Sequence, residues 1–80
     1  MKVEVQLFAT LAAYLPAGAT GDSVTLGMPD GTTVAEVIRS LRIPTHLECL
    51  TVVNGRDIPS EHRLADGDVL SLFPPLAGGS

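Results

Sequence analysis

The chain has 80 residues and a formal net charge of -4; 45% of its residues are hydrophobic, but only 4% are aromatic. This length corresponds to one domain that can fill an aliphatic core without a metal or a disulfide. The five Lys and Arg residues are spread along the chain. We therefore expect no binding to nucleic acid, which requires clustered positive charge.

The single cysteine, Cys49, excludes an intramolecular disulfide and a metal site built from several cysteines. No charged segment followed by an apolar run opens the chain, and no apolar stretch approaches the length that spans a membrane. These features predict a soluble, cytoplasmic protein that does not associate with membranes.

Polar and apolar residues alternate over residues 2–8, which predicts a half-buried strand. Phe8 is out of phase with the apolar residues before it, so we expect its side chain on the face opposite the core. The residues expected on the core face are Val3, Val5 and Leu7. Residues 9–15 then predict a short helical turn, and residues 23–28 predict a second strand.

The strongest helix signal begins at Thr33, which has the spacing of a capping box with Glu36. An apolar stripe follows at positions i, i+3, i+4 and i+7. Its members are Val34, Val37, Ile38 and Leu41. Pro44 cannot continue a helix and marks the predicted end.

Three more strands are predicted, over residues 49–53, 56–58 and 69–73. Asn54-Gly55 is a tight-turn signal between the first two of these strands. The last strand alternates, so Phe73 is expected on the face opposite the core.

The predicted order is strand, strand, helix, strand, short strand, strand. The first two strands form a hairpin, and the two terminal strands lie side by side in the centre. This is the β-grasp arrangement of the α+β class, a mixed sheet of four to five strands covered by one main helix. Because Pro74 and Pro75 cannot donate to a sheet, we predict a β-grasp domain over residues 1–75 and a flexible C-terminal tail over residues 76–80.

An active site of the chain's own is poorly supported. His46 and His62 lie in predicted loops without a paired nucleophile, and His46 with Cys49 gives too few ligands for a structural zinc site. Asp66 and Asp68 flank a glycine and are typical of a turn. The glycines lack the spacing of a phosphate-binding loop.

The tail carries the clearest chemical signal, although on composition alone it is equally compatible with a frayed chain end. Gly78 and Gly79 have no Cβ, so this backbone could pass through a channel where any side chain would clash. Pro74 and Pro75 would stiffen the exit from the last strand. Extended, residues 76–79 would reach roughly 13 Å, deep enough to carry a carboxylate into a buried catalytic pocket.

The chain resembles the MoaD/ThiS-type ubiquitin-like sulfur carriers, a family that includes the small subunit of molybdopterin synthase and the thiamin thiazole carrier. The terminal Phe-Pro-Pro-x-x-Gly-Gly pattern favours the molybdopterin type. The matching stretches, which together cover essentially the whole chain, are Val5–Ala9, Val52–Gly55, Leu64–Val69 and Phe73–Gly79.

The resemblance implies a carrier, not an enzyme. An E1-like adenylating enzyme would use ATP to activate the carboxylate of Gly79, and a sulfur donor would convert the adenylate to a thiocarboxylate. Gly78 would keep the approach narrow, and a sulfur-accepting synthase subunit would receive the sulfur. No permanently bound cofactor and no metal is implied.

The resemblance also implies a partner-binding surface. Phe8 and Phe73 match family positions on the open face of the sheet, where two aromatic rings would form a compact apolar patch. The alternative is that a loop covers them. The residues expected to bind partners are Phe8, Phe73, Pro74, Pro75, Leu76 and Ala77.

Ser80 departs from the family pattern, because Gly79 then has no free carboxylate. A peptidase could remove Ser80, the residue could be a remnant of an expression vector, or the protein could only bind partners. The alternative functions are a carrier for thiamin or sulfur amino acid biosynthesis, a non-catalytic ubiquitin-like binding module, and a protein modifier conjugated through Gly79.

Overall fold

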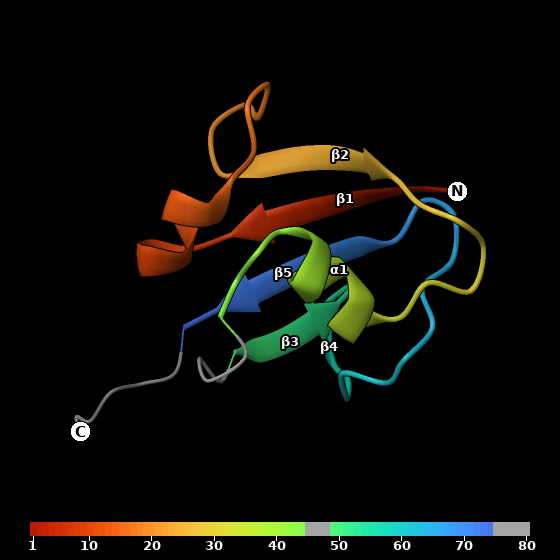
Figure 1. Cartoon of the computed structure of the whole chain (residues 1–80). Helices are drawn as coiled ribbons and strands as arrows, with labels where there is room; N and C mark the ends of the chain where they lie inside the picture. Colours follow the sequence, from red (N-terminus) through yellow and green to blue (C-terminus); the bar gives the residue numbers. More distant parts are fainter. Residues whose placement is uncertain (45–48, 75–80) are drawn as a thin grey trace.

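A computed structural model describes residues 1–44 and 49–74 of the chain. One helix covers one face of a five-stranded sheet whose strand order is β2-β1-β5-β3-β4 (Figure 1). The elements are β1 (Lys2–Leu7), the 3-10 helix η1 (Ala9–Tyr14), β2 (Ser23–Gly27), α1 (Val34–Ser40), β3 (Leu50–Val53), β4 (Arg56–Asp57) and β5 (Val69–Phe73). This architecture confirms the predicted α+β class and β-grasp fold. The predicted domain boundary at residue 75 lies outside the described residues.

The two terminal strands form the centre of the sheet, as predicted. β1 and β5 run parallel, with Val5 opposite Leu70 and Leu7 opposite Leu72. All four of these side chains are fully buried under α1, because alternate residues of each strand face the helix. The other face of both strands is therefore not part of this core.

The start of α1 follows the predicted capping box. The Thr33 hydroxyl accepts a hydrogen bond from the Glu36 backbone N–H at 3.2 Å. The Thr33 backbone N–H in turn donates to Glu36 Oε1 at 2.9 Å. Two backbone donors that have no partner inside the helix are satisfied by this exchange.

The capping box makes the stability of the fold depend on pH. Hydrogen bonds from the backbone and hydroxyl of Thr33 hold the pKa of Glu36 below its usual 4.5. A carboxylate with a lowered folded pKa stabilises the fold above its unfolded pKa, and this contribution is lost as pH falls through the folded pKa. We expect Glu36→Gln to lower the free energy of unfolding at pH 7 and to have progressively less effect below pH 4.5. Urea denaturation at several pH values measures this, and a difference that is constant with pH would contradict it.

The end of α1 differs from the prediction. The helix stops before Pro44 because Arg42 takes a left-handed conformation, with φ of 63°. Its N–H donates to the Arg39 carbonyl at 3.0 Å, and the Ile43 N–H donates to the Ile38 carbonyl at 3.3 Å. This pair of bonds is the Schellman motif, which satisfies the last carbonyls of a helix and is usually made with glycine.

The apolar stripe of α1 is also narrower than predicted. Val34 and Val37 are fully buried, and Leu41 is nearly so. Ile38, expected in the middle of the buried stripe, is only partly buried and packs against the edge of the core. Val37 is therefore the central core residue of this helix.

The Asn54-Gly55 turn joins β3 to β4 as predicted. Both residues have positive φ, 52° and 85°, the combination that a two-residue type I′ hairpin turn requires. The Asn54 side chain also reaches the start of β5, where Oδ1 accepts from the Val69 N–H at 3.0 Å and Nδ2 donates to Asp68 Oδ1 at 3.0 Å. The turn is thereby fastened to the neighbouring strand.

The two aspartates before β5 are turn residues, as predicted. Asp68 Oδ2 accepts from the Ala65 N–H at 2.8 Å, which closes the turn. Asp66 Oδ1 accepts from the Lys2 N–H at 2.7 Å and so holds the start of β1. Their hydrogen bonds to backbone groups give both carboxylates a structural role.

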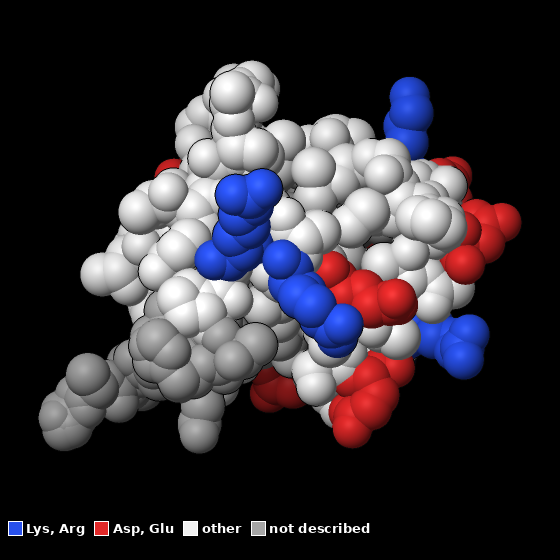
Figure 2. Space-filling model, viewed as in Figure 1, with Lys and Arg blue, Asp and Glu red and all other residues white. Residues whose placement is uncertain are grey.

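Acidic and basic side chains are interspersed on the helix-covered face of the molecule (Figure 2). Several acidic side chains gather over its lower and right-hand parts in this view, and basic side chains lie both near α1 and at the upper and right-hand edges. None of the helices in residues 1–44 and 49–74 has the length and apolar character needed to cross a membrane.

Candidate functional site

An apolar patch lies on the sheet face opposite α1, at the end of the sheet where β5 finishes. It consists of Phe8, Leu50 and Phe73, and we call it the open-face patch. Phe8 and Phe73 each follow a fully buried leucine, so the alternation of strand residues directs them away from the core. Leu50 is the direct neighbour of Phe73 across the β3–β5 pair.

Phe8 and Phe73 stack on each other. Their ring centroids are 4.7 Å apart and the ring planes differ by only 6°. Such a separation corresponds to the favourable offset arrangement of two aromatic rings. The predicted placement of both rings on one face is confirmed, but each ring is half-buried because the other ring covers it.

Backbone hydrogen bonds hold Phe8 in position immediately after β1. Its N–H donates to the Leu72 carbonyl at 3.2 Å, and its carbonyl accepts from the Leu11 N–H at 3.0 Å. Ala9 then turns the chain with a φ of 54°, a conformation that residues other than glycine adopt at a cost. These contacts fix the backbone of Phe8 beside β5.

Leu50 is the member of the patch that the sequence prediction missed. It is 53% exposed and is the exposed large hydrophobic residue of the described chain. The signal that could have found it is the alternation within β3, where Val53 is buried and Leu50 falls on the other face. A large exposed aliphatic side chain beside two aromatic rings is typical of a protein interface.

The last described residue, Pro74, comes directly after the patch in the chain. Pro74 follows Phe73 directly and is half-buried. The remaining predicted site residues lie outside the described residues: Pro75, Leu76, Ala77, Gly78, Gly79 and Ser80. The patch therefore includes Phe73, which precedes the glycine-containing segment by a few residues in the sequence.

Within the part of the chain that the structure describes, the groups considered for catalysis do not assemble into a site. Burial raises the pKa of the Cys49 thiol, which disfavours the nucleophilic thiolate at neutral pH. His62 is half-buried, and His46 lies outside the described residues. Within residues 1–44 and 49–74, no three His, Cys, Asp or Glu side chains are placed to hold a metal ion.

Comparison with models of known protein families shows to which family the chain belongs. The model of the ThiS family matches residues 5–79. The chain belongs to the ThiS family. The match ends at Gly79, so Ser80 is the one residue after it. Among curated proteins, no sequence matches the chain.

Solved structures similar to this ThiS-family protein share its whole fold. The Haloferax volcanii HVO 2177 protein is 30% identical, with a TM-score of 0.77 over 99% of this chain and 87% of that one. Small archaeal modifier protein 1 of H. volcanii is 27% identical, with a TM-score of 0.73 over 94% of this chain and 98% of that one. One chain in the protein–protein complex of subunits 1 and 2 of the Helicobacter pylori molybdopterin-converting factor is 27% identical, with a TM-score of 0.60 over 99% of this chain and 100% of that one.

Proposed function

We propose that this ThiS-family protein is a sulfur carrier whose Gly79 carboxyl group is adenylated and then thiocarboxylated. The observation that carries the proposal is the position of the open-face patch, because its residue Phe73 comes shortly before the Gly-Gly segment in the chain. The family match also ends with this Gly-Gly segment. A carrier needs these two parts, a surface that docks and a chain end that reaches. The catalytic groups belong to the partner enzymes.

The patch and the tail have separate tasks in this mechanism. Phe8, Leu50 and Phe73 bury apolar surface against an E1-like adenylating enzyme, which places the tail at the mouth of its active site. The tail delivers Gly79, whose carboxylate attacks the α-phosphorus of ATP and displaces pyrophosphate. A sulfur donor then displaces AMP from the acyl carbon. Adenylation is required because a free carboxylate is a poor electrophile.

Ser80 makes a maturation step part of the proposal. As long as Ser80 is attached, the carbonyl of Gly79 is an amide and offers no carboxylate to ATP. A peptidase that removes one residue exposes the carboxylate without altering the domain. We propose a sulfur-accepting synthase subunit of molybdopterin biosynthesis as the final partner, with thiamin and sulfur amino acid pathways as the alternatives. The similarity to a subunit of the H. pylori molybdopterin-converting factor complex supports this choice.

The experiment uses two forms of the protein, one ending at Gly79 and the other with Ser80. Each is incubated with the E1-like enzyme of the same organism, ATP and a sulfide donor, and its intact mass is measured. We expect the shorter form to gain the mass of one oxygen-to-sulfur exchange, and the longer form to stay unchanged. A folded shorter form that gains no sulfur would overturn the proposal.

A second candidate is a protein modifier that is conjugated through Gly79. The similarity to small archaeal modifier protein 1 favours it. Both functions begin with adenylation, so they differ only in the group that attacks the acyl carbon. Trypsin cleaves after Arg63, the last basic residue before the tail, so a conjugate leaves residues 64–79 on the target lysine. Finding that remnant in a cell lysate by mass spectrometry would support the modifier.

A further inference from the structure

Lys2 is the one lysine in the chain. The other basic residues, Arg39, Arg42, Arg56 and Arg63, are all arginines. A guanidinium group stays protonated in proteins and does not accept acyl groups, whereas a lysine amine does so in its neutral form. An activated carboxyl group that meets another copy of this protein therefore finds a single side-chain amine.

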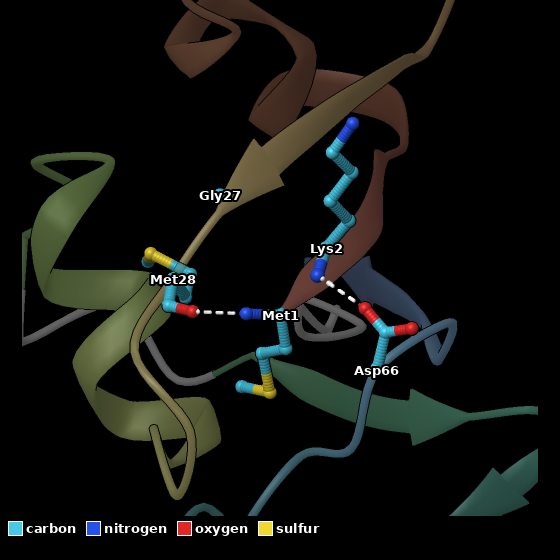
Figure 3. Close-up of a pocket in the computed structure, with 5 residues that line it drawn as sticks. All are labelled: Met1, Lys2, Gly27, Met28 and Asp66. Carbon is cyan, nitrogen blue, oxygen red and sulfur yellow. Dashed lines mark hydrogen bonds between the residues drawn. The ribbon is translucent and has the colours of Figure 1, made fainter.

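Two hydrogen bonds hold the backbone of Lys2 in place. The Lys2 N–H donates to Asp66 Oδ1 at 2.7 Å, and the Lys2 carbonyl accepts from the Gly67 N–H at 2.8 Å. The side chain itself is exposed. Figure 3 shows the side chain extending away from Asp66 and Met28.

The competing amine, the α-amino group of Met1, is engaged elsewhere. It donates to the Met28 carbonyl at 2.8 Å and lies 3.6 Å from Asp30 Oδ1 (Figure 3). The Met1 side chain beside it is almost completely buried, at 1% exposure. Acylation of this amine would remove its charge and break its contact with Asp30.

Lys2 and Phe73 lie at opposite ends of the sheet. β1 and β5 are parallel, so Lys2 lies where both strands begin and Phe73 lies where β5 ends. The rise of a strand separates Lys2 from Leu7, next to the patch, by roughly 16 Å. A chain end that leaves β5 at Phe73 would have to turn back along the length of the sheet to reach its own Lys2. The amine of a second copy requires no such reversal.

We propose that Lys2 is an acylation site, the acceptor for the activated Gly79 of a second copy of this chain when no sulfur donor is present. The inference rests on the proposed adenylation of Gly79. The neutral Lys2 amine attacks the acyl carbon of the Gly79 adenylate and forms a C–N bond. The C–O bond to AMP breaks, AMP leaves with the electron pair, and the amine proton passes to solvent. ATP supplies the energy, and the first product is an isopeptide-linked dimer, which keeps the Gly79 carboxyl group of the acceptor copy and the Lys2 amine of the donor copy.

The test uses the form ending at Gly79, with the E1-like enzyme and ATP and no sulfide donor. Exchange of pyrophosphate into ATP reports adenylation, and intact mass reports products. We expect a species of twice the chain mass less one water, whose tryptic digest joins residues 64–79 to Lys2. Lys2→Arg keeps the charge and the backbone contacts, so it should abolish the dimer and leave exchange and melting temperature unchanged.

A third variant distinguishes a defined site from any exposed lysine. Lys2→Arg combined with Arg56→Lys places the amine on the exposed edge strand β4 instead. We expect this variant to form no dimer. Restoration of the dimer by Arg56→Lys, a dimer in Lys2→Arg alone, a chain closed on itself, or normal exchange without any linked product would each overturn the proposal. Loss of exchange itself would reject the proposed function together with this inference.

Discussion

Replacing Leu70 with alanine should lower the free energy of unfolding by about 2–5 kcal/mol, the range for a large-to-small change in a packed core. Leu70 is fully buried in the central strand β5, between Val5 on β1 and Val53 on β3. A domain of this size has a total stability of about 4–12 kcal/mol. This one substitution therefore removes a large share of the stability, and urea denaturation followed by circular dichroism measures it.

Leu50→Ala is the matched control, because it removes the same atoms from the other face of the sheet. Leu50 is 53% exposed, so the change should cost less than about 1 kcal/mol. Equal losses of stability at Leu50 and Leu70 would contradict the assignment of one face to the core and the other to a partner.

Phe8→Ala should weaken binding to the adenylating enzyme by about 30-fold, the effect of removing an aromatic hot-spot residue worth 2 kcal/mol. The loss has two sources. The Phe8 ring no longer contacts the partner, and Phe73 loses the ring that stacks on it at 4.7 Å. Isothermal titration calorimetry of the folded variant against the enzyme measures the affinity.

Two other substitutions complete this experiment. Leu50→Ala should also weaken binding while leaving stability nearly unchanged, because its exposed side chain belongs to the same patch. Tyr14→Ala removes another partly buried aromatic ring, one that packs against the core at the end of η1. It should lower stability without changing affinity. Unchanged affinity in Phe8→Ala and Leu50→Ala would rule out the open-face patch as the docking surface.

Local sequence signals predicted most of the elements, because their physical causes are themselves local. The Thr33 and Glu36 spacing predicted the helix start, since the capping box needs only two residues three apart. Asn54-Gly55 predicted the hairpin because few other dipeptides accept positive φ at both positions. The alternation in the terminal strands correctly placed Phe8 and Phe73 on one face.

The features that the sequence did not predict depend on tertiary contacts. The helix ends at a left-handed Arg42 rather than at Pro44. An arginine in the sequence does not by itself predict a left-handed conformation. The alternation within β3 could have placed Leu50 on the open face, but its position beside Phe73, which lies 23 positions later in the chain, is a tertiary contact. The fastening of Asn54 to Asp68 and of Lys2 to Asp66 likewise joins segments that are distant in sequence.

Pyrophosphate exchange into ATP tests the central claim most directly, because it reports activation of the chain end before sulfur or any acceptor is involved. The E1-like enzyme is assayed with the form ending at Gly79, the same form carrying Gly78→Val, and the 80-residue chain. We predict exchange with the first form only, since a Val side chain blocks the approach and Ser80 blocks the carboxylate. Exchange that persists in the 80-residue chain, or that is absent from the folded form ending at Gly79, would contradict the account.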